Sequence, residues 1–464
     1  MLYGLADVAV LAVGGLLLLP LYTRALTQTE FGVFVAVRTN TEILTYVLYL
    51  GLPSAVARVY FDYRERGEHR EYLGSVLIFF AANLALCAVI FSIWGDKLWH
   101  LLSPTTPPYP YVWFSFALAA VGFFGSIGAL LLRLERRVRT FAGLQVGTSL
   151  LLAAAAIIFL VVLKWGVPGL LTALLISSAC NAAVLPWMLR RSFKLSISSR
   201  HIVDSMRYAG PILVGYIAYF VLNRTSTLVL QHNVDLSEVA VFGVAQQLAS
   251  IVAIAGTSFG KAAQPAVFAA SAADAGALMT RAARILMLLM LGVTCLVLTF
   301  ASELFAIAAP KGYAGGFQPL LILTVAGLAY SFSFVSDTAL LYHRRPKLSV
   351  AVSLSGAAMS TLLALVLVPR WGVHGAALGV AGGFLTTAAV GQALAHRVTG
   401  QSYLAAMVGI LATATSVALL AAWLDRLQLP LAASLGVKSA VVATVAAALL
   451  AYRSAAAKKA RGAP

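Results

Sequence analysis

Runs of about 20 apolar residues recur along the whole chain with short polar connections between them, and this pattern restricts the fold more than any other feature. A helix of about 20 residues crosses the hydrocarbon core of a bilayer. Only helices and closed barrels satisfy their backbone polar groups in lipid, and long unbroken apolar runs favour helices. The composition agrees, since 61% of the 464 residues are hydrophobic and only 11% are charged. We therefore predict an all-α polytopic membrane protein.

The apolar runs predict about fourteen transmembrane helices (about ±3 residues at each end). Their predicted ranges are 4–23, 31–57, 72–95, 110–132, 140–163, 168–189, 208–231, 237–260, 282–308, 315–342, 347–369, 372–395, 402–424 and 434–452.

The lysines and arginines, 33 in all, are distributed unevenly among the connections. Connections that follow even-numbered helices carry most of them, and the alternation holds along the chain. Basic loops mark the cytoplasmic side, so both termini are predicted to be cytoplasmic. The net charge of +17 is therefore a topology signal, reinforced by anionic lipid headgroups, and no nucleic-acid partner is expected.

Two short patterns occur twice. Residues 165–169 (Trp-Gly-Val-Pro-Gly) return as 371–375 (Trp-Gly-Val-His-Gly), and 30–34 are echoed by 238–242. An even number of helices separates the copies, so the two halves are predicted to insert with the same polarity, as in transporters built from parallel repeats. Each Trp-Gly copy is predicted to be a turn between two helices.

The repeat predicts two parallel-related six-helix lobes and two additional C-terminal helices. The predicted boundaries are 1–195 for the N-terminal lobe, 196–400 for the C-terminal lobe, and 401–464 for the last two helices with a basic cytoplasmic tail.

Two arginines, Arg38 and Arg224, lie inside predicted helices at similar depths. Because a buried arginine facing lipid costs at least about 2.5 kcal/mol, such residues face the protein interior or a wet cavity. We hypothesise that the two arginines face each other across a cavity between the lobes and bind an anionic headgroup, since guanidinium forks fit phosphate oxygens. The alternative for Arg38 is a structural ion pair with Glu42, four residues later on the same helix face.

Four further residues are candidates. Asn223 and Tyr219 lie near Arg224, and Gln246 lies in the next predicted helix. Hydrogen bonding between helices is the alternative role for Gln246, and packing or an interfacial position is the alternative for aromatic residues such as Tyr219. Asp7 is a possible ion-coupling carboxylate; its position near a helix end also suits a purely interfacial role.

Patterns for catalysis are weak. The seven histidines are scattered without metal-ligand spacing, and there is no P-loop glycine pattern. We expect no metal, no cofactor and no enzymatic activity.

Three regions resemble the polysaccharide (O-antigen-type) flippases of the multidrug/oligosaccharidyl-lipid/polysaccharide export superfamily. They are 26–32 with 50–55, then 207–211 with Asn223 and Arg224, then 368–377. The likeness covers nearly the whole chain in order and spacing. The family often has Asp-Arg where this chain has Asn223-Arg224, which puts a shared ion-pair role in doubt.

The resemblance implies a transporter that flips a polyprenyl-pyrophosphate-linked oligosaccharide to the outer leaflet by alternating access, for cell-surface polysaccharide or O-antigen synthesis. It implies the bacterial cytoplasmic (inner) membrane as location. Membrane lipid and the lipid-linked oligosaccharide would be its partners, with glycosyltransferases and a polymerase of the same pathway as possible further ones. The alternatives are a cation-coupled multidrug antiporter, a peptidoglycan-precursor flippase and, in another class, a membrane glycan polymerase or ligase. The deep arginines favour an anionic substrate over cationic drugs.

Overall fold

The computed structural model describes residues 12–189, 194, 196–268, 272–427, 436, 438 and 439. Every element in these residues is helical, and eleven helical segments within them are long and apolar enough to cross a membrane. The chain is thus an all-α polytopic membrane protein, as predicted. The described part of the first predicted helix begins at Ala12, and most of the predicted helix 434–452 lies outside the described residues.

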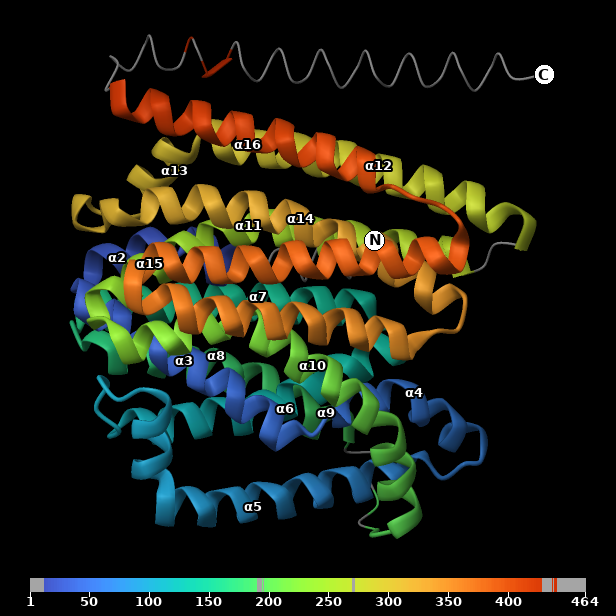
Figure 1. Ribbon diagram of the computed structural model, residues 1–464. Coiled ribbons are helices and arrows are strands. Elements are labelled where there is room, and N and C mark those ends of the chain that lie inside the picture. The colour runs from blue at the N-terminus through green and yellow to red at the C-terminus, as the bar shows by residue number, and fades with distance from the viewer. Residues whose placement is uncertain are drawn as a thin grey trace. The chain divides into compact units, whose positions relative to one another are not determined.

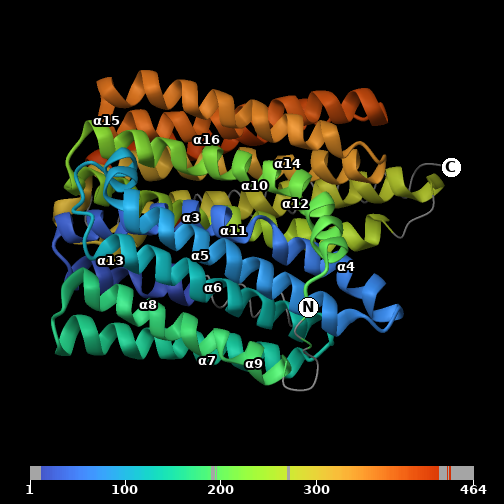
Figure 2. The same ribbon diagram turned by 90° about the horizontal axis from the view of Figure 1, so that it is seen from below.

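The chain forms two compact units, Met1–Gly243 and Val244–Pro464. The helices of the first unit run lengthwise beside one another (Figures 1 and 2). They are η1 (Ala12–Leu17), α2 (Leu19–Ala25), α3 (Gln28–Tyr49), α4 (Leu52–Glu65), α5 (His69–Leu102), α6 (Tyr111–Leu134), α7 (Val138–Ile157), η2 (Ile158–Val162), α8 (Gly166–Ala182), α9 (Val184–Leu189) and α10 (Ser199–Asn233), followed by the first residues of α11 (Leu236–Phe268).

The second unit holds the remainder of α11 and a set of long helices in which α14 packs along α15 and α12 packs against α14 and α16. Its further elements are α12 (Ala272–Thr299), α13 (Ala301–Ala308), η3 (Lys311–Gly316), α14 (Phe317–Tyr342), α15 (Pro346–Thr399) and α16 (Leu404–Leu427). The predicted lobe boundaries at 195 and 400 stay a prediction.

The start of α3 follows directly from its sequence. The Thr27 hydroxyl accepts a hydrogen bond from the Glu30 backbone N–H at 3.2 Å, and the Glu30 carboxylate accepts one from the Thr27 N–H at 2.8 Å. This reciprocal capping box satisfies two N–H groups that a helix start leaves unpaired. It fixes where α3 begins and hence the register of every α3 side chain discussed below.

The predicted single helix 31–57 is wrong, because the structure divides it into α3 and α4. Leu50 and Gly51 both adopt the left-handed conformation, with φ of 46° and 74°, and Pro53 lies in the first turn of α4. Proline fits a first turn but cannot continue a preceding helix, since it lacks the N–H that a helix interior needs. The predicted span is therefore a broken helix.

The predicted helix 282–308 is also divided: α12 ends at Thr299 and the short α13 follows. The predicted turns at the two Trp-Gly repeats are confirmed. Gly166 has a φ of 60° at the start of α8, and Gly372 has a φ of 50° and a ψ of −124° at the break within α15. Both glycines occupy backbone regions that residues with a Cβ rarely adopt.

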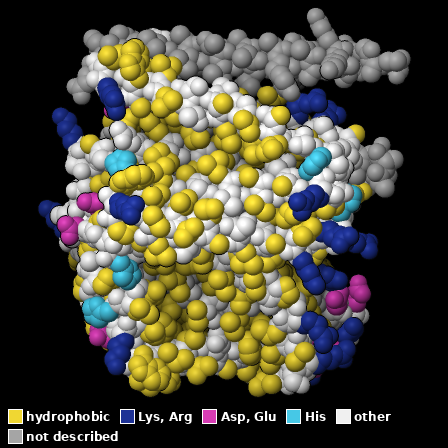
Figure 3. All heavy atoms as spheres, viewed as in Figure 1, with side chains coloured by type: hydrophobic (Ala, Val, Ile, Leu, Met, Phe, Trp, Pro, Cys, Tyr) yellow, Lys and Arg dark blue, Asp and Glu magenta, His cyan; other side chains and the backbone are white. Residues whose placement is uncertain are grey.

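Apolar side chains form both the core and much of the surface. In the first unit, the rings of Phe80 and Phe123 stack with their centroids 3.5 Å apart, inside a cluster that joins α3 to α6. Figure 3 shows apolar side chains over the middle of the visible face and Lys and Arg side chains toward its edges. An apolar surface bordered by basic groups is the pattern of a protein surrounded by lipid.

Candidate functional site

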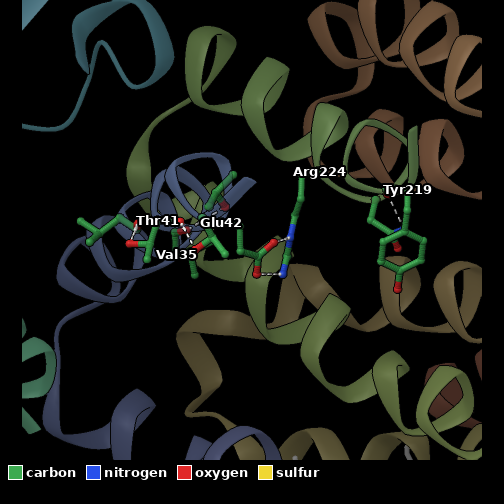
Figure 4. Close-up of polar contacts among 9 residues, drawn as sticks. Val35, Thr41, Glu42, Tyr219 and Arg224 are labelled. Carbon is green, nitrogen blue, oxygen red and sulfur yellow. Dashed lines mark hydrogen bonds and ion pairs between the residues drawn. The ribbon is translucent and has the colours of Figure 1, made fainter. Parts of the chain in front are cut away.

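An ion pair between Glu42 and Arg224 joins α3 to α10 within the first unit. The Arg224 Nε donates to one carboxylate oxygen of Glu42 at 2.7 Å, and a terminal guanidinium nitrogen donates to the other at 2.6 Å. Figure 4 shows the two side chains pointing toward each other from their helices. The side chains of Arg224 and Glu42 remain 22% and 33% exposed, so the pair is partly accessible. A two-pronged pair of this kind is strong and directional.

Arg38 lies one helical turn before Glu42 in α3 and is exposed. Glu42, Arg224 and Tyr22 are the groups close enough to Arg38 to act on it electrostatically. The cluster therefore combines two guanidinium groups with one carboxylate, within helices long and apolar enough to span a membrane. Its net positive charge suits an anionic ligand, because the single carboxylate neutralises only one of the two cations.

The structure assigns Glu42 to Arg224, a partner that the sequence did not reveal. The two residues are 182 positions apart, so their spacing carries no signal. The sequence suggests Arg38, four residues before Glu42, as the partner of that carboxylate. In the structure, Arg224 donates hydrogen bonds to both carboxylate oxygens of Glu42. Both arginines lie in the first unit.

The other predicted site residues lie at different places. Asn223 is half-buried and donates its side-chain amide to the backbone oxygen of Tyr219 at 2.9 Å. The ring of Tyr219 is exposed and points away from the ion pair (Figure 4). Gln246 is half-buried in the part of α11 that belongs to the second unit. Asp7 lies outside the described residues.

A buried polar network on the same two helices was missed by sequence analysis. The Asn40 amide donates to the Ser103 hydroxyl at 2.9 Å, and that hydroxyl donates to the side-chain oxygen of Gln231. All three residues are buried. Asn40 lies between Arg38 and Glu42, and Gln231 lies two turns beyond Arg224. Since unpaired polar groups are costly in an apolar interior, this network holds α3 against α10 beside the ion pair.

On the opposite side of the ion pair the two helices are joined by aromatic residues. Tyr46, one turn after Glu42, lies with its ring centroid 6.3 Å from that of Tyr216 and 5.7 Å from that of Phe220. The hydroxyl of Tyr216 lies 2.9 Å from the Ser54 hydroxyl at the start of α4. The guanidinium cluster is thus flanked by a hydrogen-bonded network on one side and by aromatic rings on the other.

No group of three or more histidine, cysteine, aspartate or glutamate side chains able to hold a metal ion occurs among the residues that the structure describes. The chemistry that the cluster offers is electrostatic binding of an anion within apolar surroundings. Among the side chains of this cluster, the two guanidinium groups have the geometry that fits phosphate oxygens.

The family model for polysaccharide biosynthesis proteins matches residues 8–271, which is more than half of the chain. The chain belongs to this family. No curated protein matches it by sequence.

Solved structures of membrane transporters share the fold. The lipid II flippase MurJ in an inward closed conformation is similar with a TM-score of 0.74 and 11% identity, over 98% of this chain and 99% of that one. A multidrug resistance MATE family transporter in an inward-facing conformation gives a TM-score of 0.66 and 18% identity, over 86% of this chain and 94% of that one. A transporter from Pyrococcus furiosus, described as having a binding pocket of reverse polarity, gives 0.54 and 17% identity over 86% and 94%.

The chain is thus a multi-pass membrane protein of the polysaccharide biosynthesis family, and its fold is the one seen in the MurJ and MATE structures.

Proposed function

We propose that the protein flips a polyprenyl-pyrophosphate-linked oligosaccharide from the cytoplasmic to the outer leaflet by alternating access, for the synthesis of a cell-surface polysaccharide such as O-antigen. It would act in the bacterial cytoplasmic membrane with both termini inside. Glycosyltransferases would supply its substrate and a polymerase would consume the product. Membership of the polysaccharide biosynthesis family supports this assignment.

The observation that carries the proposal is the cluster of Arg38, Glu42 and Arg224. A substrate of this class combines a diphosphate, a polar glycan and a long apolar tail. The diphosphate cannot enter hydrocarbon without compensating partners. Two guanidinium groups close enough to act on each other electrostatically provide charge and directional donors for its oxygens.

Glu42 has a definite role in this proposal. It occupies the Arg224 guanidinium while no substrate is bound, so this partly buried positive charge is never left without a counter-ion. A diphosphate then replaces the Glu42 carboxylate as the counter-ion of the Arg224 guanidinium. Exchange of one anion for another keeps binding reversible, which a transporter requires because it must also release its cargo.

The test is a flipping assay with the purified chain in proteoliposomes. The probe is a fluorescent short-chain polyprenyl pyrophosphate carrying one sugar, and its transfer between leaflets is followed by a membrane-impermeant quencher. We expect Arg38→Ala and Arg224→Ala to lower the flipping rate at least about tenfold, because each removes one cationic partner of the diphosphate. Arg426→Ala, at the end of α16, is the matched control and leaves the rate unchanged. Flipping that persists in Arg224→Ala at the wild-type rate would overturn the site.

A further inference from the structure

Aromatic side chains continue the contact between α3 and α10 on one side of the guanidinium cluster. Phe220 and Tyr216 lie one and two turns before Arg224 in α10, and Tyr46 lies one turn after Glu42 in α3. At a rise of 1.5 Å per residue, the Tyr216 backbone is about 12 Å from that of Arg224 along the helix. The two helices run in opposite directions here, since positions that rise along α3 meet positions that fall along α10.

The three rings differ in exposure. Phe220 is buried and Tyr46 is half-buried, whereas the Tyr216 side chain is 42% exposed. Phe220 and Tyr46 pack as an edge-to-face pair, with planes 66° apart. Tyr216 lies over Tyr46 at an interplanar angle of 34°. Tyr216 is therefore the accessible member of this aromatic group, in which Tyr46 contacts both other rings and Phe220 is buried.

A hydrogen bond sets the orientation of this exposed ring. The Tyr216 hydroxyl bonds to Ser54, which lies in α4 just after the break at Leu50 and Gly51. The bond anchors the edge of the ring through its hydroxyl and leaves part of the ring surface uncovered. An exposed ring held in one orientation loses little rotational freedom when a ligand packs on it, which favours binding.

We propose that Tyr216, supported by Tyr46 and Phe220, is a docking surface for a pyranose ring of the transported glycan. The proposal rests on the proposed function, because it takes the diphosphate to lie on Arg38 and Arg224 and places the sugar next to it. The apolar C–H face of a pyranose carries partial positive charge, and the face of an aromatic ring carries partial negative charge. The hydroxyls at the edge of the sugar remain free for water or polar groups.

This assignment gives the site two separate functions. The guanidinium groups recognise the diphosphate that every lipid-linked precursor shares. The aromatic surface distinguishes a glycosylated carrier from the bare carrier that returns after the glycan has been transferred. A transporter that binds both equally would be occupied by bare carrier, so discrimination at the first sugar determines specificity.

The competing interpretation is that Tyr216 only ties α10 to α4 through Ser54. The two interpretations make opposite predictions for two conservative variants. Tyr216→Phe and Ser54→Ala both delete the hydrogen bond and keep an aromatic ring at position 216. Tyr216→Leu keeps apolar bulk but removes the aromatic face. Stacking needs the ring, whereas a tie between helices needs the hydroxyl.

The experiment measures the Kd of the purified full chain in nanodiscs for two probes. One is bare short-chain polyprenyl pyrophosphate, and the other is the same lipid carrying a single N-acetylglucosamine. We expect the wild type to bind the glycosylated probe about five- to tenfold more tightly than the bare one. Tyr216→Leu and Tyr216→Ala remove this difference. Tyr216→Phe and Ser54→Ala retain it, and so does the control Tyr208→Ala, a 41%-exposed tyrosine on the same helix.

Equal binding of both probes by the wild type would overturn the docking surface, and so would a loss of discrimination in Tyr216→Phe and Ser54→Ala as large as that in Tyr216→Leu. Failure of the proposed function gives a different result. In that case neither probe binds the wild type, or Arg224→Ala binds both as well as the wild type does.

Discussion

The side-chain amide of Asn83 in α5 donates a hydrogen bond of 3.0 Å to the backbone oxygen of Leu48, two residues before α3 breaks. A second contact of 3.2 Å reaches the oxygen of Val47. The break at Leu50 and Gly51 leaves these carbonyls without the N–H groups that a continuous helix would provide. In an apolar span an unpaired carbonyl costs free energy, so Asn83 is what makes a broken helix tolerable at this position.

Asn83→Leu removes this compensation and is expected to lower the free energy of unfolding by about 1–3 kcal/mol, because two carbonyls lose their partner. The measurement is thermal unfolding of the purified protein in one detergent. Ser92→Ala is the matched control: its hydroxyl bonds only within α5, to Ala88. Equal stability of Asn83→Leu and Ser92→Ala would show that the carbonyls find other partners.

Glu42→Gln is expected to have opposite effects on stability and on ligand binding. Loss of the carboxylate charge leaves the Arg224 guanidinium without its counter-ion. The free energy of unfolding therefore falls by about 1–3 kcal/mol, and the melting temperature falls with it. The same loss removes the anion that competes with a diphosphate. The affinity for bare polyprenyl pyrophosphate should therefore rise about three- to tenfold.

The two effects of Glu42→Gln are measured on one preparation, by thermal unfolding and by the Kd for the bare lipid. Arg58, which pairs with Asp62 in α4 with both side chains at least half exposed, provides the control. Asp62→Asn removes a carboxylate from that exposed ion pair and is expected to change neither quantity. A weaker affinity in Glu42→Gln would mean that the carboxylate assists binding.

Substitution by alanine is expected to have opposite effects on stability at Gly32 and at Gly143. A Cβ at Gly32 would lie 1.9 Å from the backbone oxygen of Leu236, at the start of α11, whereas a Cβ at Gly143 in α7 meets nothing within 4 Å. Gly32→Ala forces the two backbones apart and should cost about 1–3 kcal/mol. Gly143→Ala should stabilise by about 0.5–1 kcal/mol, since alanine favours a helix. Thermal unfolding of both variants checks the contrast, and a stabilised Gly32→Ala would contradict it.

The sequence predicted the helical architecture because the apolar runs have the length that a bilayer requires. It located the two turns because the Trp-Gly pattern occurs twice along the chain. It also contained a signal for the break in the second span: Gly51 and Pro53 stand two residues apart. Apolar composition on both sides hid this signal, since hydropathy does not distinguish a broken helix from a continuous one.

For the candidate site, the cost of placing a charge within an apolar span was enough to single out Arg38 and Arg224 as candidates. It was not enough to name their partners. The Glu42–Arg224 pair and the Asn40–Ser103–Gln231 network depend on which helices pack together, and residues more than 60 positions apart carry no local pattern that reveals this. The outward position of Tyr216 likewise depends on the rotation of α10 against α3.

The stability of the second unit is expected to depend on pH through Glu303. This carboxylate lies in α13, outside the membrane-spanning segment that ends at Thr299, and accepts hydrogen bonds from Lys438 at 2.6 and 2.8 Å. Burial opposes ionisation of Glu303, but hydrogen bonds from Lys438, the backbone and Ser302 outweigh it and hold the pKa of Glu303 below its ordinary value of 4.5. The Lys438 side chain is only 5% exposed, so its ammonium depends on this partner.

Because the folded pKa of Glu303 lies below the unfolded one, its contribution to stability is complete above the unfolded value and is lost as the pH falls through the folded value. Glu303→Gln should therefore be less stable than the wild type near neutral pH, by about 1–3 kcal/mol, since the buried ammonium loses its counter-ion. The difference should shrink as the pH is lowered below 4.5 and the wild-type carboxylate takes up a proton. Thermal unfolding of both proteins across this range decides the point. A constant difference at every pH would show that Glu303 stabilises α13 through packing alone, because a contact between uncharged groups does not respond to protons.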